Sequence, residues 1–248
     1  MDRMIYLAMS GAKNVLKAQA AVTNNLANAS TKGFRADFSA FRAMPVFGEG
    51  HPDRVYALAE RPAIDFTQGA IVRTGNALDV AVDGEGWLAV QAPDGTEGYT
   101  RAGELHLTGN GQLVTASGLA VLGNGGPIAM PPAESLEIAP DGTISVRPLG
   151  QQANTLAQVD RIKLVNPGNE RLEKGEDGLF RIAGEDGAVA PPEAAVRLGT
   201  GAVESSNVNS VEMLTAMISL QRQFELQVKA MRTANDNASA AAQLLRLG

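Results

Sequence analysis

Residues 208–246 read VNSVEMLTAMISLQRQFELQVKAMRTANDNASAAAQLLR, and this stretch decides which fold to expect. It has no Gly or Pro, and the residues of one face recur at alternating spacings of three and four, which is a heptad pattern. The pattern predicts a helix about 58 Å long, at about 1.5 Å per residue. Candidate N-caps precede it at Ser205, Ser206 and Asn207. Its contact face consists of Leu214, Met217, Gln221, Phe224, Val228, Met231, Asn235, Ala238, Ala242 and Leu245.

A second heptad face lies at the other end of the chain, in residues 1–29. It consists of Ile5, Ala8, Ala12, Val15, Gln19, Val22, Leu26 and Ala29. One such face alone is equally typical of an amphipathic helix that covers a globular core. Two of them, at opposite ends of one chain, favour helices that pair with each other and with neighbouring subunits. Gln221 and Asn235 are polar residues in the C-terminal face, and such residues can fix the register of a coiled coil at a cost in stability.

The sequence between the two helices has a β pattern. Asp-Gly and Asn-Gly pairs separate short alternating runs, and these pairs predict tight turns because both residues accept positive φ. The predicted strands are Leu78–Val82, Trp87–Gln91, Gln112–Thr115, Thr143–Val146, Arg161–Val165 and Leu179–Ile182. The expected fold class is α+β, with long, coiled-coil-like paired terminal helices around a mostly antiparallel β domain. We expect four parts: a helix at 1–29, an extended connector at 30–74 with a short hairpin around Ala63–Val72, the β domain at 75–204, and the C-terminal helical part at 205–248.

Composition excludes several classes of function. The net charge of −6 lacks the basic field that nucleic-acid binding requires. The chain has no Cys, which excludes disulfide and thiolate chemistry. No run approaches the roughly 20 apolar residues that a membrane span needs. Met4–Ala12 resembles the apolar part of a signal peptide, but Lys13 and Lys17 interrupt it, so we expect no cleavage.

The search for catalytic or metal-binding residues gives no coherent set. His51 and His106 lack a second ligand at metal-binding spacing. Asp79 lies at the entry of a predicted strand and Asp83 opens a predicted turn. These ordinary positions explain the two residues better than a catalytic acid–base pair does. Trp87, the only Trp, continues an apolar strand and is expected in the core. We therefore predict no catalytic residue, no cofactor and no metal; the carboxylates weighed for a catalytic pair are Asp65, Asp79, Asp83 and Glu85.

Three groups of residues carry a resemblance to a known family. They are Asn24–Arg35 (NNLANASTKGFR), Leu78–Trp87 (LDVAVDGEGW) with Tyr99–Gly103 (YTRAG), and Ser206–Met213 (SNVNSVEM). In order and position they resemble the signatures of bacterial flagellar rod and hook proteins. The asparagines of the first group are suited to end a helix through local side-chain–backbone bonds. The opening residues Met1–Ala12 (MDRMIYLAMSGA) are most similar to the proximal-rod subunits of this family, with the distal-rod subunits as the nearest alternative.

The resemblance implies a structural role. Proteins of this family polymerise helically into the basal-body rod, the drive shaft that transmits torque from the motor to the hook. The implied partners are other copies of the chain, other rod subunits, the flagellar type III export apparatus and ring proteins around the rod. The implied location is the periplasmic part of the basal body. A periplasmic protein that binds or hydrolyses peptidoglycan through the β domain is the alternative from another class.

Assembly should bury the faces of both terminal helices. These faces carry more apolar surface than a lone monomer tolerates, so we expect the helices to gain order when subunits associate. Phe34 should anchor the connector after the first helix. The expected assembly residues are Ile5, Ala12, Val15, Val22, Leu26, Phe34, Leu214, Met217, Gln221, Phe224, Val228, Met231, Asn235 and Leu245.

Overall fold

The fold divides into two compact units, each built from separate stretches of the chain. The helical unit comprises Met1–Ala29, Ala36–Asp65 and Val208–Gly248, and the β unit comprises Ser30–Arg35 and Phe66–Asn207. The predicted α+β class, with terminal helices flanking an antiparallel β region, is confirmed. The structure is a computed structural model that describes residues 4–38, 41–45, 55–59, 63–148, 156–184 and 187–246.

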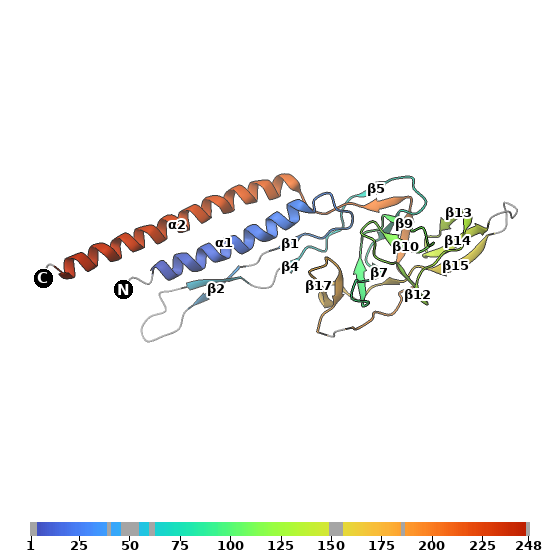
Figure 1. Cartoon of the computed structure of the whole chain (residues 1–248), viewed down its shortest axis with the longest axis horizontal. Helices are drawn as coiled ribbons and strands as arrows, with labels where there is room; N and C mark the ends of the chain where they lie inside the picture. Colours follow the sequence, from blue (N-terminus) through green and yellow to red (C-terminus); the bar gives the residue numbers. More distant parts are fainter. Residues whose placement is uncertain are drawn as a thin grey trace. The chain divides into compact units, whose positions relative to one another are not determined.

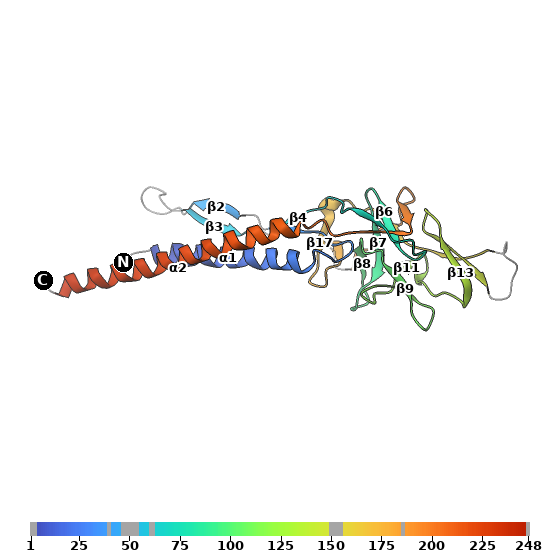
Figure 2. The ribbon, with the colours of Figure 1, turned by 90° about the horizontal axis from the view of Figure 1, so that it is seen from above.

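Two antiparallel helices dominate the helical unit. α1 spans Met4–Ala27 and α2 spans Ser210–Arg246, and the two run side by side in both views (Figures 1 and 2). In the residues of this unit that the structure describes, four short strands form two antiparallel pairs. They are β1 (Asp37–Phe38) with β4 (Ala63–Ile64), and β2 (Phe41–Pro45) with β3 (Val55–Ala59).

The N-cap of α2 lies a few residues after the positions that the sequence predicted. The side-chain oxygen of Asn209 accepts hydrogen bonds from the backbone N–H groups of Val211 (3.1 Å) and Glu212 (3.3 Å). Asn209 is therefore the N-cap, instead of a residue in the range 205–207. Glu212 adds a negative charge to the first turn, where it interacts favourably with the helix dipole.

The described residues of the β unit form antiparallel strands and one 3₁₀ turn. A five-stranded sheet has the order β16-β7-β8-β18-β17, and a three-stranded sheet has the order β13-β14-β15. The remaining strands form two-stranded pairs: β9 with β10, β11 with β12, β6 with β19, and β5 with β20. Their bounds are β5 Ile71–Arg73, β6 Val80–Asp83, β7 Trp87–Gln91, β8 Glu97–Thr100, β9 Leu105–Leu107, β10 Leu113–Thr115, β11 Leu122–Gly123, β12 Gly126–Pro127, β13 Ala133–Ile138, β14 Thr143–Pro148, β15 Ala157–Arg161, β16 Leu164–Val165, β17 Leu172–Lys174, β18 Phe180–Ile182, β19 Arg197–Thr200 and β20 Ala202–Glu204, with the 3₁₀ turn at Asn169–Arg171.

The prediction of a hairpin around Ala63–Val72 is wrong. β4 pairs with β1, and β5 pairs with β20, so the two segments do not pair with each other. Both partners are distant in sequence, which a local turn pattern cannot reveal. In the described part of the chain the Asp-Gly and Asn-Gly pairs mark turns. Only glycines adopt positive φ there, so the Asp and Asn of these pairs do not use the positive φ that they could accept.

The core of the β unit is aliphatic with one aromatic cluster. Trp87 is 1% exposed, which confirms its expected place in the core. Its ring centroid lies 4.5 Å from that of Phe180 and 6.1 Å from that of Phe66. The aliphatic part consists mainly of Val80, Val82, Leu88, Leu105, Leu113, Val121, Ile128, Ile138, Ile144, Val146, Ile162, Leu164, Val196 and Leu198.

Candidate assembly surface

Two contacts define the register of α1 against α2. The Asn25 amide nitrogen lies 3.8 Å from the Met213 sulfur. A Cβ atom on Gly11 would lie 2.9 Å from the amide carbon of Gln227, so the glycine allows close approach there. In both pairs the two residue numbers add up to 238. Because the helices are antiparallel, every α1 residue lies opposite the α2 residue whose number, added to its own, gives 238. By this register, which we call the intrachain register, Met4 lies opposite Ala234.

α1 turns small side chains inward. Among the predicted assembly residues, Ala12 and Val15 are buried, while Ile5, Val22 and Leu26 are half-buried. The small residues permit close helix packing but contribute little apolar area per contact. The complete buried set of α1 is Ala8, Ala12, Asn14, Val15, Ala18 and Asn25.

The predicted face of α2 divides into two groups. Met217, Phe224, Val228 and Met231 are half-buried, whereas Leu214, Gln221 and Asn235 are exposed. The side chain of Leu245 lies outside the described part of the chain. The buried and half-buried residues of α2 form a face that is rotated from the predicted one. They are Met213, Ala216, Met217, Leu220, Phe224, Gln227, Val228, Ala230, Met231 and Ala234.

Phe34 lies in the β unit and not on a terminal helix. Its side chain is half-buried, and the ammonium nitrogen of Lys174 lies 3.9 Å from its ring centroid. Lys174 also donates a hydrogen bond of 3.0 Å to the backbone oxygen of Arg35. These contacts fix the segment that follows α1 within the β unit. Whether Phe34 takes part in assembly stays a prediction.

Both helices expose large apolar side chains on their outer faces. On α2 these are Val211 (70% exposed), Leu214 (49%), Ile218 (55%) and Leu226 (65%). On α1 they are Met4 (46% exposed), Tyr6 (59%), Met9 (56%) and Leu16 (50%). Apolar residues grouped in this way on a helix surface are typical of protein–protein contacts.

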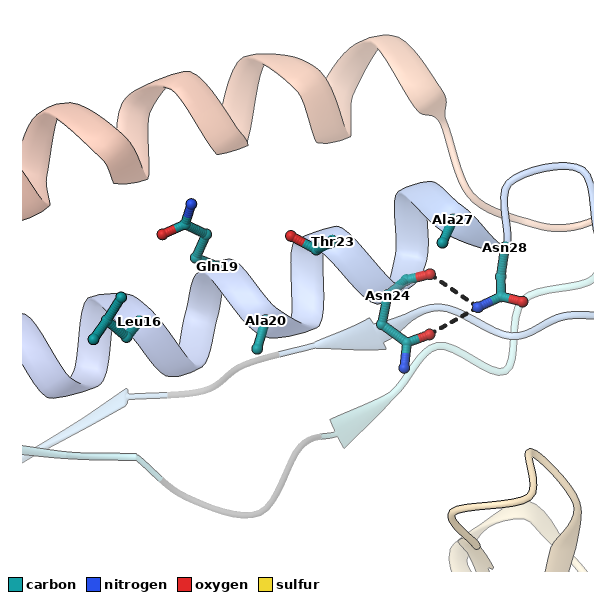
Figure 3. Close-up of a pocket in the computed structure, with 7 residues that line it drawn as sticks. All are labelled: Leu16, Gln19, Ala20, Thr23, Asn24, Ala27 and Asn28. Atoms are coloured by element: carbon teal, nitrogen blue, oxygen red, sulfur yellow. Dashed lines mark hydrogen bonds between the residues drawn. The ribbon is translucent and has the colours of Figure 1, made fainter.

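A shallow groove runs along the C-terminal half of α1 (Figure 3). Its volume is about 690 Å³, and it lies over one side of the helix. At its end, the amide of Asn28 donates hydrogen bonds to the backbone oxygen (3.0 Å) and the side-chain oxygen (2.8 Å) of Asn24. The lining residues are Leu16, Gln19, Ala20, Thr23, Asn24, Ala27 and Asn28.

Asn25 makes a contact that the sequence did not suggest. It is 2% exposed, and its amide donates to the backbone oxygen of Asp37 (2.8 Å) while its oxygen accepts from the Asp37 N–H (2.9 Å). The Asn28–Asn24 bonds are the expected local helix end, but Asn25 instead holds β1 against α1. Its partner is twelve residues away, beyond the reach of local capping rules.

A buried ion cluster ties together three distant segments of the β unit. Glu204 is 0% exposed and accepts hydrogen bonds from the guanidinium groups of Arg35 and Arg101 and from the Gly69 N–H (3.0 Å). Burial lowers the pKa of Arg101, and the Glu204 carboxylate opposes that shift. The sequence did not single out Glu204, because nothing near it in the chain shows that two arginines approach it. Removal of one partner from such a cluster would leave an uncompensated buried charge.

A second groove, of about 500 Å³, lies in the β unit and is lined in part by carboxylates. Its carboxylates include Asp94 and Asp177. A hydrogen bond from Arg181 lowers the pKa of Asp177, and a hydrogen bond from Thr96 lowers the pKa of Asp94. A glycosidase general acid needs a raised pKa, so neither carboxyl group has the property of that acid.

The described residues also contain no group of three or more His, Asp or Glu that could hold a metal ion. His106 is exposed on β9, and His51 lies outside the described residues. None of the helices described is long and apolar enough to cross a membrane.

Comparison with known proteins gives the family. Residues 5–35 match the family described as flagella basal body rod protein, residues 81–146 match the flagellar hook protein FlgE/F/G D1 domain, and residues 200–244 match the flagellar basal body rod FlgEFG protein C-terminal family. The chain is 45% identical over 251 residues to the flagellar basal-body rod protein FlgF of Escherichia coli (strain K12), with all of both chains covered. The chain belongs to the flagellar basal-body rod protein family.

Further relatives agree with this membership. The FlgF protein of Salmonella typhimurium (strain LT2) is 44% identical over 251 residues, again with all of both chains covered. The FlgG protein of Bacillus subtilis (strain 168) is 30% identical, with 95% of this chain and 96% of the relative covered. Within the rod family, the chain is thus most like FlgF. The two matches to rod families fall on α1 and α2, and the D1 match falls in the β unit.

Proposed function

We propose that this chain is a structural subunit of the proximal rod of the bacterial flagellar basal body. The observation that carries this conclusion is its similarity, over the whole length, to basal-body rod proteins named FlgF. The distal-rod alternative is less favoured, because the two relatives with 44–45% identity are FlgF proteins, whereas the FlgG relatives are 30–36% identical, in the range that also includes more distant FlgF proteins at 29–30%.

Assembly through the outer helix faces is the mechanism that fits this function. Leu214 is 49% exposed and Ile218 is 55% exposed, so burial of the exposed part of each contributes about half of the 1.5–3 kcal/mol of a whole side chain, and the two together offset part of the entropy lost on association. A contact between different faces of successive copies does not close into a ring, and it therefore propagates as a helical polymer. Such a polymer would transmit torque from the motor towards the hook.

The finer features of this role are also part of the proposal. The subunit would be exported by the flagellar type III apparatus without a cleaved signal peptide and would lie in the periplasmic part of the basal body. Its neighbours would be other rod subunits, with ring proteins around them. It would carry out no catalysis.

A complementation experiment tests the proposal. Cells that lack the gene should not swim, and the restored chain should co-purify with basal bodies in a fixed ratio to the other rod subunits. Basal bodies of normal composition without the chain would contradict the proposal. Incubation of the full chain with purified peptidoglycan tests the alternative, for which release of soluble fragments would be the supporting result.

A further inference from the structure

α2 continues beyond its partner helix. Its last buried residue is Ala234, which lies opposite Met4 in the intrachain register. Residues 235–243 are all exposed, and the helix continues to Arg246. Residues 235–246, which we call the α2 extension, are about 18 Å long. Most helical stability in proteins comes from tertiary packing, so this segment would be stabilised by a partner that covers it.

The groove on α1 has the length and chemistry to hold this extension. It runs from Leu16 to Asn28, which is also about 18 Å of helix. Ala20 and Ala27 in the groove, and Ala238 and Ala242 in the extension, would allow close approach of the two backbones. Amide side chains accompany the alanines on both elements, and they can form hydrogen bonds across the contact.

The extension cannot reach the groove of its own chain. In the intrachain register Ala20 lies opposite Ile218, and Ala242 is about 36 Å further along α2. A second copy has no such restriction. Because the helices are antiparallel, the extension projects past the N-terminal end of α1. A copy displaced in that direction can place the C-terminal half of its own α1, where the groove lies, beside the extension.

We propose that the α2 extension of one copy packs antiparallel into the α1 groove of the next copy. Ala242 then lies near Ala20, with residue 235 near Ala27 and residue 246 near Leu16. This inference rests on the proposed function and specifies one head-to-tail contact of the polymer. The contact joins two different surfaces, so it repeats from copy to copy without closing.

Disulfide cross-linking tests the contact, because the chain has no cysteine of its own. The variant Ala20→Cys with Ala242→Cys is expressed in cells that lack the gene, and basal bodies are purified and oxidised. A disulfide requires Cα atoms within about 7 Å, so we expect dimers and higher multimers that reduction converts to monomer. The matched control is Ala20→Cys with Ala240→Cys, whose second cysteine lies on the opposite side of the extension. It should give at least tenfold less multimer.

The outcomes separate this inference from the proposed function. Basal bodies that contain the Ala20→Cys, Ala242→Cys variant without multimers would overturn the inference alone. A cross-link to a different rod subunit would overturn the choice of a second copy as the occupant. Absence of the unmodified chain from basal bodies would overturn the proposed function.

A second pair of variants tests the contact in case the cysteine variant does not assemble. Ala242→Trp overfills the contact and should abolish swimming, while Ala240→Trp should leave it unchanged. Normal swimming of both would overturn the inference.

Discussion

Gly33 follows α1 and its turn, and it lies where only a glycine fits. Its φ is +68°, and a Cβ atom would lie 2.2 Å from the backbone carbon of Arg101. Its N–H donates a hydrogen bond of 2.8 Å to the backbone oxygen of Glu204. The residue thus joins the same three segments as the buried ion cluster, through the backbone instead of through charge.

Replacement of Gly33 by Ala should destabilise the β unit more than the same change at Gly95. Gly95 also has positive φ, +84°, but a Cβ atom there would meet nothing within 4 Å. Gly95→Ala therefore costs only the conformational strain of about 1–2 kcal/mol. Gly33→Ala adds a backbone clash, for which we expect a further loss of about 1–3 kcal/mol. Urea unfolding of both variants measures the difference, and equal losses would contradict the close approach at Gly33.

Tyr99 predicts a specific dependence of stability on pH. Its side chain is 0% exposed and accepts a hydrogen bond of 2.7 Å from the Ala190 N–H, and burial raises the pKa of its phenol from 10.0 to about 12. The folded chain then holds this proton more tightly than the unfolded chain. The stabilisation is complete below pH 10 and is lost as the pH rises from 10 to about 12.

The variant Tyr99→Phe isolates this effect, because it has no proton to lose at that position. The free energy of unfolding should fall more steeply between pH 10 and 12 in the natural chain than in Tyr99→Phe. Parallel curves for the two proteins would show that burial of Tyr99 does not hold the proton.

Among the elements, α2 shows what the sequence could and could not determine. The heptad spacing predicted a helix at 208–246, and α2 spans Ser210–Arg246. It did not fix which face turns inward. Apolar residues flank the central line of Met217 and Phe224 on both sides, with Leu220 on one side and Leu214 on the other. A helix that contacts one partner within the chain and others outside it is apolar on more than one face, so its sequence cannot say which partner each face takes.

Phe224 should stabilise the helix pair within the single chain. It is half-buried in α2, on the side that faces α1. Phe224→Asp would place a charge in this contact, so we expect loss of helical signal in circular dichroism and loss of swimming, while the β unit unfolds as before. Gln223→Asp is the matched control, because Gln223 is exposed. Similar effects of both variants would contradict the inward position of Phe224.

For the whole molecule, alternating patterns predicted individual elements, but contacts between distant segments stayed hidden. Trp87–Gln91 was predicted as a strand and is β7. The pairing of β5 with β20, the bond from Asn25 to Asp37 and the approach of two arginines to Glu204 all join residues that only the fold brings together. The contacts of the exposed apolar side chains on α1 and α2 cannot be predicted from local patterns either, because under the proposed function their partners lie in other copies of the chain.

The central claim is that assembly buries the outer face of α2, and labelling of Ile218→Cys tests it most directly. The chain has no other cysteine, and Ile218 is 55% exposed in the single chain. A maleimide reagent should therefore label the isolated variant rapidly and should label it at least tenfold more slowly in purified basal bodies. Equal labelling rates in both forms would contradict the claim.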